Sequence, residues 1–554
     1  MRLAMSQATW ERQWTDNLPA SVARLVLARH AELIETGESV PGIRHVGSSP
    51  LYVPNVWLAQ QGEELKVAHV TQAFDEQAIR DHAENYARLC SRMQSLESRQ
   101  SFALYLGIEP PAGKSITPLG AVARLDDPLW WRRQLRKRWT RSAENAMRDL
   151  GIVRKGREPY ASEQAVRHRG AQKRRMRAFL GDHAAVNELG EQLPLLEVAE
   201  KSLANPAIRR GEFMTRVRGF EEIARDMGHV AEFVTLTAPS FFHAQLAKGG
   251  RNPLFERAIV RDAQGWLCKM WARARAKLKR LSILFYGFRI AEPHHDATPH
   301  WHLLLFVPAH AVGALRAVLT GFWLSDHASE RGAAEHRAKF ETIDPARGSA
   351  AGYIAKYVSK NIDGAGEIGI AEDSETGARV ADGIERVDAW ASIHGIRQFQ
   401  QIGGPPVGLW RELRRIRKPV DDNEIEVARL AAEARSFAGM VRAVGGIGAG
   451  RCTTVRVWKE HLGTVSRYGD VQGAVPAGIM RGAFHVRTRS HVWRIVRAGC
   501  GTGRNSATQA VDSASPASLF SSLGPVAITV RGAAGLNEPA GWSNPNETSQ
   551  AGPL

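Results

Sequence analysis

The chain has 554 residues, and Lys and Arg outnumber Asp and Glu by 74 to 57, which gives a formal net charge of +17. This length exceeds what one hydrophobic core usually supports, so it predicts two to four structural units, and the charge favours a polyanionic partner such as nucleic acid. Hydrophobic residues make up 44% of the chain and charged residues 24%, which argues against a fibre or a wholly disordered protein.

The four cysteines, Cys90, Cys268, Cys452 and Cys500, lie far apart and form no C-x-x-C pair. Their spacing argues against a zinc finger and a disulfide framework and fits a reducing compartment. The N-terminal residues show no apolar signal core, and no run of about eighteen apolar residues occurs. We therefore expect a cytoplasmic protein that does not enter a membrane.

Residues 1–129 show helical amphipathic patterns, for example at 22–27 and 78–83, separated by Gly and Pro. We predict a mainly helical N-terminal region, to which no motif assigns a role. Residues 113–115 read Gly-Lys-Ser and prompt an ATP-driven helicase as an alternative. That alternative is weak, because the upstream Gly107 is one residue too far for a phosphate-binding loop and two prolines stiffen the intervening segment.

Residues 130–228 are predicted to form a basic helical region that contacts DNA, with helix continuing over 185–228. Cations cluster at 130–139 and 173–177, and tryptophans are interleaved with the first cluster. Arginine neutralises phosphates and indole faces can stack on bases, although each run alone is also typical of a solvated helical face. The predicted DNA-binding residues are Arg132, Arg133, Arg136, Lys137, Lys173, Arg174 and Arg175.

A new domain is predicted over residues 229–418, because the hydrophobic period changes from about 3.6 to about 2 at 232–237. This change indicates a strand. The elements predicted next are a basic helix at 271–280, a strand at 283–290, a turn at 293–299 and a strand at 300–307.

The last of these strands carries His300 and His302, whose alternation places both imidazoles on one face. Two imidazoles with a carboxylate suit Mn²⁺, Mg²⁺ or Zn²⁺. Glu292 ends the preceding strand and is the predicted third ligand. His294 and His295 in the turn stay open as alternatives, because hairpin register cannot be read from sequence. Taken alone, the histidine pair would rather indicate half-buried structural residues.

Residues 350–361 predict a helix on which Tyr353 and Tyr357 are four apart and share one face. Seen along the helix axis, Lys360 lies at an angle between the two tyrosines. A phenol titrates near 10, so it needs a stabilised oxyanion or a polarised target, which a metal and Lys360 would supply. An ordinary amphipathic helix with tyrosines at the core is the alternative.

The remainder of the chain carries no catalytic motif. Residues 419–500 are predicted to form a C-terminal accessory region, in which the alternating stretches 455–458 and 492–496 look like isolated strands. Residues 501–554 are rich in Ser, Gly, Ala, Asn and Pro, and this composition predicts a disordered tail.

From about Trp130 to Arg417 the chain resembles the bacteriophage replication gene A protein family, the double-tyrosine branch of the HUH rolling-circle endonucleases. Three motifs carry the resemblance in order: residues 233–240, 292–306 and 353–361. It implies an α+β fold, an HUH endonuclease domain with a central antiparallel sheet flanked by helices. The two histidines would occupy a middle strand, with the tyrosine helix packed nearby. Ala297 stands where a glycine would be expected in such a motif.

The same resemblance implies a site-specific nickase and strand transferase that initiates rolling-circle replication of a phage or prophage through a 5′-phosphotyrosine. By position, His300, His302 and Glu292 would hold Mg²⁺ or Mn²⁺, and Tyr353 and Tyr357 would alternate as nucleophiles. The implied partners are DNA, as a single strand or melted origin, and a host helicase and DNA polymerase. A rolling-circle transposase or plasmid initiator would share these motifs, and a non-catalytic DNA-binding protein is the alternative of another class.

Overall fold

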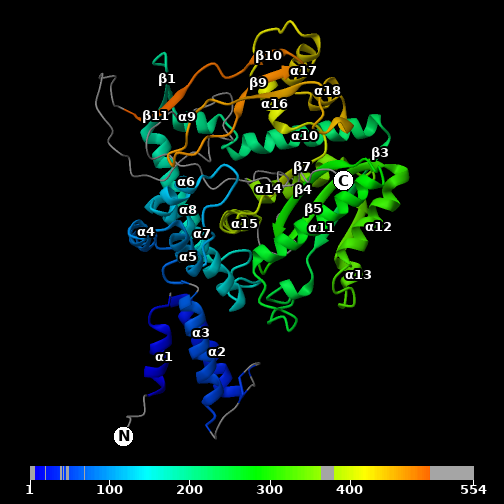
Figure 1. Ribbon diagram of the computed structural model, residues 1–554. Helices are drawn as coiled ribbons and strands as arrows, with labels where there is room; N and C mark the ends of the chain where they lie inside the picture. Colours follow the sequence, from blue (N-terminus) through cyan, green and yellow to red (C-terminus); the bar gives the residue numbers. More distant parts are fainter. Residues whose placement is uncertain are drawn as a thin grey trace. The chain divides into compact units, whose positions relative to one another are not determined.

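The computed structural model describes residues 6–18, 20–37, 40, 43–44, 49–67, 69–362 and 380–498. The chain divides into two compact units, each built from two segments (Figure 1). The first unit comprises Met1–Gly170 and Phe220–Gly403, and the second comprises Ala171–Gly219 and Gly404–Leu554. Helices and antiparallel sheets occur in both, so the α+β class is confirmed. Among the described residues, no helix combines the length and apolar character that a membrane span requires.

The N-terminal part of the first unit is helical, as the sequence predicts. Its helices are α1 (Gln7–Thr15), α2 (Ala20–Thr36), α3 (Tyr52–Val67), α4 (Glu76–Ser91), α5 (Leu96–Tyr105), α6 (Pro118–Leu125), α7 (Pro128–Asp149) and α8 (Glu163–Asp182), the last of which continues into the second unit. Several begin at a capping side chain. Asp127, for example, accepts a hydrogen bond from the Leu129 backbone at the start of α7, directly before Pro128.

A five-stranded antiparallel sheet forms the centre of the first unit, in the order β6-β3-β5-β4-β7 (Figure 1). Its strands are β3 (His229–Thr237), β4 (Tyr286–Pro293), β5 (Pro299–Pro308), β6 (Ala338–Thr342) and β7 (Phe399–Ile402). The middle strand is β5, and its residues 299–307 are all buried, which fits its nearly continuous apolar sequence. The predicted strands are confirmed, but β4 begins and ends three residues later than predicted, which shortens the turn to 294–298.

Both faces of this sheet are covered, and different helices cover them. On one face Trp301 donates a hydrogen bond to Gln264 of α11 (Val260–Arg280), and Arg316 of α12 (Val312–Trp323) pairs with Glu232 of β3. On the other face His302 contacts α14 (Ala350–Ile362). The remaining elements of the first unit are η1 (Ser240–Phe242), η2 (Ala309–Ala311), α13 (Ala333–His336) and α15 (Val380–His394), with α10 (Pro206–Asp226) shared with the second unit.

The second unit contains two three-stranded sheets, ordered β11-β1-β2 and β10-β9-β8. Its strands are β1 (His183–Asn187), β2 (Gln192–Pro194), β8 (Arg456–Glu460), β9 (Val475–Arg481), β10 (Phe484–Arg487) and β11 (Trp493–Arg497). Its other helices are α9 (Leu195–Glu200), α16 (Val407–Leu413), α17 (Asn423–Glu433), α18 (Phe437–Ala443) and η3 (Ile447–Ala449). The strands predicted at 455–458 and 492–496 therefore exist, but they are paired rather than isolated.

One prediction in this unit was wrong. The sequence predicts continuous helix over 185–228, whereas β1 and β2 occupy most of residues 183–194. In β1, His183 pairs with Arg497 and Asn187 with Trp493, so its partner strand lies some three hundred residues later in the chain. Local periodicity carries no information about a partner that distant, and tertiary pairing overrides it.

Candidate metal and nucleophile site

The hairpin of β4 and β5 brings three potential metal ligands together. Glu292 and His300 are direct cross-strand partners, and His302 lies two residues along β5 on the same face. All three side chains are buried, with exposed fractions of 1%, 4% and 8%. The register that the sequence left open thus places the Glu292 carboxylate beside both histidines.

The geometry of these three groups fits a divalent metal ion. Their ligand atoms all lie within 4.8 Å of one another, and among the described residues they form the one such group of His, Cys, Asp and Glu. The two Nε2 atoms are 3.0 Å apart, and Nε2 of His302 lies 3.8 Å from a Glu292 oxygen. Two imidazole nitrogens with one carboxylate oxygen suit Mg²⁺, Mn²⁺ or Zn²⁺ and leave positions for substrate oxygens.

A neighbouring strand orients one of these ligands. Thr235 on β3 is the cross-strand partner of His302, and its Oγ1 lies 3.1 Å from His302 Nδ1. If Nδ1 of His302 donates its proton to this hydroxyl, the lone pair of Nε2 is free to bind a metal ion. Metal-binding histidines usually have such a hydrogen-bonded second nitrogen. The Thr235 hydroxyl therefore acts as an outer partner that fixes the His302 ring.

The two alternative ligands have other surroundings. The ring of His294 stacks on the ring of His300 with centroids 4.0 Å apart, and it also contacts His243 at 5.0 Å. His295 is buried, and its charge is one of those that lower the pKa of the adjacent Asp296. Neither histidine belongs to the group that Glu292 forms with His300 and His302.

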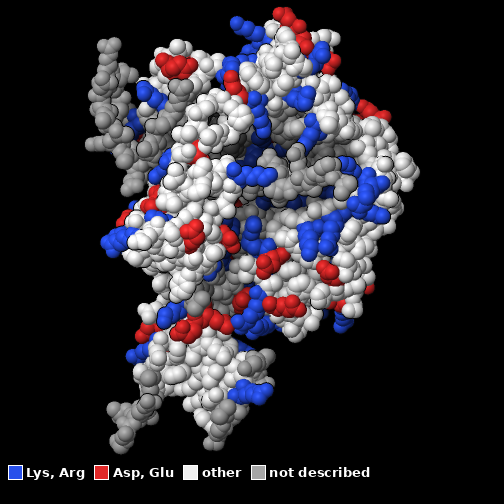
Figure 2. Space-filling model, in the orientation of Figure 1, with Lys and Arg blue, Asp and Glu red and all other residues white. Residues whose placement is uncertain are grey.

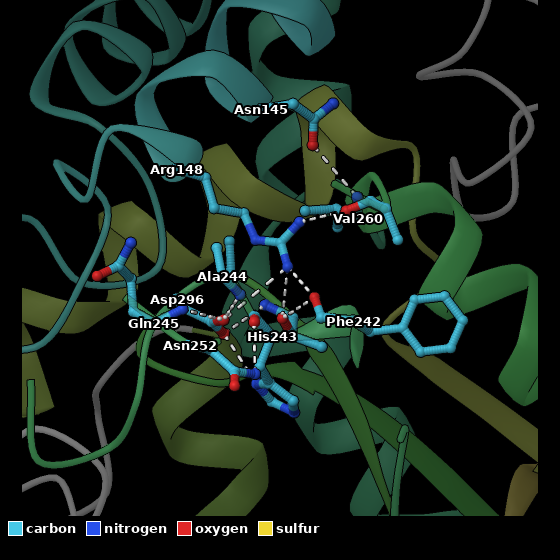
Figure 3. A network of polar contacts seen from close by, with 12 residues as sticks. Asn145, Arg148, Phe242, His243, Ala244, Gln245, Asn252, Val260 and Asp296 are labelled. Atoms are coloured by element: carbon cyan, nitrogen blue, oxygen red, sulfur yellow. Dashed lines mark hydrogen bonds and ion pairs between the residues drawn. The ribbon is translucent and has the colours of Figure 1, made fainter. Parts of the chain in front are cut away.

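A buried polar network fixes the turn between the two strands (Figure 3). Asp296 accepts hydrogen bonds from the backbones of Ala244 and Thr298, and Arg148 of α7 donates to the Thr298 hydroxyl and the Phe242 carbonyl. Burial by itself raises the pKa of Asp296, but the nearby His243, Arg148 and His295 hold it well below its usual range. The network ties the turn to the segment after β3.

The turn also explains the alanine at position 297. Ala297 has φ +67°, in the left-handed region that favours glycine, and it is buried. Its amide bonds the His294 carbonyl at 2.8 Å, and its carbonyl accepts from the Trp390 indole at 2.9 Å. The backbone therefore keeps the geometry of a glycine-type turn although a methyl group is present.

The tyrosine helix packs on the histidine face of the sheet. The first turn of α14 is fixed by Ser349, whose hydroxyl accepts from the Gly352 amide at 2.9 Å. The Tyr357 ring lies 4.4 Å from the His302 ring, measured between centroids. Phe233 of β3 lies beneath both phenols, at 4.8 Å from Tyr353 and 5.1 Å from Tyr357. The structure thus brings the paired imidazoles and the paired phenols to one face.

The two phenols have different surroundings. Tyr353 donates a hydrogen bond through Oη to the Glu341 carboxylate on β6. Burial and Glu341 raise the pKa of Tyr353 to about 12. Burial also raises the pKa of Tyr357, followed by the charge of Glu292 and the neighbouring Tyr353 and Glu341. Both phenols are therefore protonated at neutral pH in the absence of a cation.

Two residues that sequence reasoning missed follow from strand register. Glu341 is the cross-strand partner of Phe233, and Lys339 is the partner of Thr235, so both side chains belong to the histidine face. Lys339 is exposed and places a cation beside the site. Neither residue could be found without the pairing of β6 with β3, because the sequence there gives no clear strand pattern.

The predicted DNA-contacting residues are distributed over both units. Arg132 and Arg136 on α7 both donate to the Glu76 carboxylate, at 2.7 and 2.5 Å. Arg133 is half-buried and Lys137 is exposed on the same helix. Lys173, Arg174 and Arg175 are exposed on the part of α8 that belongs to the second unit. The side chain of Lys360 lies outside the described part of the structure.

The tryptophans of α7 are not available for stacking on bases. Trp130, Trp131 and Trp139 are 5%, 0% and 2% exposed and belong to the hydrophobic core. The Trp131 indole donates to the Leu125 carbonyl at 2.7 Å. These tryptophans are residues 3, 4 and 12 of α7, on a core-facing stripe that alternates in sequence with the cations. The sequence alone therefore could not separate the core residues from the DNA-contacting ones.

Comparison with known proteins identifies the family of the chain. The profile of the bacteriophage replication gene A protein (GPA) family matches residues 66–365. The replication gene A protein of Escherichia phage 186 is 40% identical over 414 residues, which is 71% of this chain and 59% of that protein. The probable replication protein P12 of Pseudoalteromonas phage PM2 is 41% identical over 334 residues, 59% of this chain and 51% of that protein.

A third relative is a probable replication endonuclease from a prophage-like region of Escherichia coli O6:H1, 39% identical over 346 residues, which cover 59% of this chain and 42% of that protein. The chain thus spans about half the length of these relatives. No solved structure matches the chain. The matched region contains the complete β4–β5 hairpin and both tyrosines of α14, and the chain belongs to the bacteriophage replication gene A protein family.

Proposed function

We propose that the chain is a site-specific single-strand DNA endonuclease and strand transferase that initiates rolling-circle replication of a phage or prophage. The observation that carries this proposal is the shared face on which Tyr357 lies 4.4 Å from His302. Acid, base or metal chemistry alone needs no pair of phenols. A tyrosine nucleophile, in contrast, needs a phenol and the metal ligands around the same phosphate. A relative named as a probable replication endonuclease supports the same activity.

The arrangement of the sheet supports an HUH endonuclease fold for the first unit. Its two histidines lie on the middle strand of five, and α14 packs on their face. Glu292, His300 and His302 would hold Mg²⁺ or Mn²⁺. When bound there, the ion supplies charge that polarises a non-bridging phosphate oxygen and stabilises the transition state.

The chain's own residues would perform the transfer as follows. The Oη of one tyrosine attacks the phosphorus, and a phosphotyrosine bond to the 5′ side forms as the bond to the 3′ oxygen breaks. The 3′ oxygen takes a proton from water and leaves as a hydroxyl that can prime synthesis. For Tyr353 the phenolic proton passes to Glu341, to which it is already hydrogen-bonded. The other tyrosine would then attack the regenerated junction, with its phenolic proton passing to water. The 3′ hydroxyl freed in that second cut would attack the first phosphotyrosine, so that the strand is rejoined and the first tyrosine is released as a phenol.

Around this step, the predicted cations would hold the DNA as a single strand or melted origin. Lys360 is proposed to offset charge at the phosphate. The seven predicted cations of α7 and α8 are proposed to contact the DNA backbone: Arg132, Arg133, Arg136, Lys137, Lys173, Arg174 and Arg175. A host helicase and DNA polymerase are proposed partners, and the cytoplasm of the bacterial host is the proposed place of action. The division of the chain into N-terminal, DNA-contacting, nicking and accessory regions is likewise a proposal.

Replacement of Glu341 by Gln tests the assignment of the proton acceptor. In a Tyr357→Phe background, Glu341→Gln is expected to slow DNA cleavage by about 100-fold, because the remaining nucleophile Tyr353 loses its base. In a Tyr353→Phe background the same change is expected to alter the rate less than about twofold. Single-turnover cleavage of an end-labelled strand measures both. An equal effect in the two backgrounds would assign Glu341 a structural role only.

The proposed function itself is tested with the full chain and supercoiled DNA that carries the phage or prophage region from which the gene comes. Conversion to open circles is expected with Mg²⁺ or Mn²⁺ and is expected to stop in excess chelator, because the donor set at Glu292 then lacks its ion. Supercoiled DNA that is bound but never nicked would support a non-catalytic DNA-binding protein instead. Full nicking in chelator would contradict the metal site.

A further inference from the structure

Helix α11 has two sides of opposite character. Its inner side is apolar and buried against the sheet, where Trp301 of β5 donates a hydrogen bond to Gln264 at 3.2 Å. Its outer side is exposed and strongly basic. The exposed cations of α11 are Arg261, Lys269, Arg273, Arg275, Lys277, Lys279 and Arg280.

Five of these cations define the α11 basic face: Lys269, Arg273, Lys277, Lys279 and Arg280. Over the described residues, the structure shows none of the five in an ion pair with a carboxylate. After Asp262 the helix contains no acidic residue at all. The contrast with α7 is clear, since Arg132 and Arg136 there share the Glu76 carboxylate.

Folding alone does not require this composition. Lys269, Arg273 and Lys277 follow one another at spacings of four, and like charges at that spacing destabilise a helix. Cations in the last turn interact favourably with the helix dipole, but Lys269 and Arg273 lie in the middle of α11. A run of cations that costs helix stability and lacks acidic partners fits a polyanionic ligand.

The location of this face separates it from the nicking site. Trp301, which contacts α11, and His302, which contacts α14, are adjacent residues of β5 and therefore point to opposite faces of the sheet. Figure 2 shows Lys and Arg side chains gathered where Figure 1 draws α11. From Lys269 to Arg280 the helix rises about 16 Å, the length of roughly five phosphate steps along one DNA strand.

We propose that the α11 basic face binds the phosphate backbone of DNA outside the nicking site. The identity of the polyanion as DNA rests on the proposed function, but the face itself does not depend on catalysis. A second contact of this kind would hold DNA while the scissile strand is cut and released at the opposite face of the sheet.

A triple variant of the full chain tests this inference: Lys269→Gln, Arg273→Gln and Lys277→Gln. Binding to a fluorescent single strand and to the duplex of the same sequence is measured in chelator over a series of salt concentrations. The plot of log affinity against log salt is expected to become shallower by about 2.7 for the duplex or about 2.1 for the single strand, since each of the three lost phosphate contacts removes about 0.9 or about 0.7, respectively. Affinity at low salt is expected to fall at least about tenfold, whereas a saturating short single strand is cleaved at an unchanged rate. The DNA form whose slope falls by its own three-contact value is the form that the α11 basic face binds.

The matched control removes the same charge from exposed cations of the first unit that are already ion-paired: Lys66→Gln, Arg167→Gln and Arg257→Gln. This control is expected to bind DNA like the parent chain. An unchanged salt slope in the α11 variant, or equal losses in both variants, would overturn the proposal. The proposal would also be overturned if the α11 variant lost binding to vesicles of anionic phospholipid but kept its affinity for DNA. A parent chain that binds through α11 but never nicks supports this inference and contradicts the proposed function, so the two can fail separately.

Discussion

Replacing either of the two histidines proposed to bind the metal is expected to abolish DNA cleavage while DNA binding persists. For His300→Ala and His302→Ala we expect the single-turnover cleavage rate to fall by at least about a thousandfold, roughly 4 kcal/mol of transition-state stabilisation. The reason is geometric: the two Nε2 atoms are 3.0 Å apart, and with a Glu292 oxygen they form the proposed metal site, whose ligand atoms lie within 4.8 Å of one another. Each substitution leaves two ligands, which is too few to hold a divalent ion firmly.

DNA affinity in the same variants is expected to stay within about threefold of the parent chain, since binding depends on dispersed cations. His310→Ala is the matched control, because this histidine is exposed in η2, just beyond the opposite end of β5. It should nick like the parent chain. Parallel loss of cleavage and binding would show that His300 and His302 are structural, and unchanged cleavage would remove them from the site.

The second large effect is expected from the phenols. Tyr353→Phe combined with Tyr357→Phe should reduce cleavage to background, a loss of at least about a thousandfold, because no nucleophile remains near the metal position. Each single variant should still cut one strand, since either phenol can reach a phosphate at this face. The assay is conversion of supercoiled DNA to open circles, followed by detection of protein that stays attached to DNA after denaturation.

Tyr105→Phe is the control for this pair, since Tyr105 is 86% exposed on α5 and far from the histidine face in sequence and contacts. It should leave both nicking and attachment unchanged. Nicking that persists in the double variant would mean that the reaction does not use these tyrosines. Complete loss in both single variants would mean that the two phenols act together in one step.

The two single tyrosine variants also need not behave alike. Tyr353 already has a hydrogen-bond acceptor in Glu341, whereas Tyr357 lies against the His302 ring. Burial and negative charge raise the pKa of both phenols in the metal-free arrangement. A cation at Glu292 would oppose that effect most strongly for Tyr357, for which the Glu292 charge is the largest cause after burial. The metal thus matters more for Tyr357, and Glu341 for Tyr353.

Much of this site was readable from the sequence because its parts are local. The alternation of His300 and His302 and the spacing of Tyr353 and Tyr357 each define a face within one element. The choice of Glu292 required the register of β4 with β5, and Glu341 and Lys339 required the pairing of β6 with β3. Register depends on contacts across the sheet, so no single window of sequence carries it.

The basic helices show the same limit. Sequence reasoning selected α7 because cations and tryptophans alternate there, but the tryptophans are core residues and two of the arginines pair with Glu76. It gave no role to α11, where the five cations of the α11 basic face are exposed and have no carboxylate partner among the described residues. Charge is visible in a sequence, whereas the partner that neutralises it is visible only after folding.

In the proposed reaction, a tyrosine of α14 becomes covalently joined to DNA. Mass spectrometry of the peptide that remains linked after nicking and nuclease digestion tests it most directly. A nucleotide phosphate is expected on Tyr353 or Tyr357, within the peptide that spans residues 350–362. A modified residue elsewhere in the chain, or efficient nicking without any linked peptide, would contradict it.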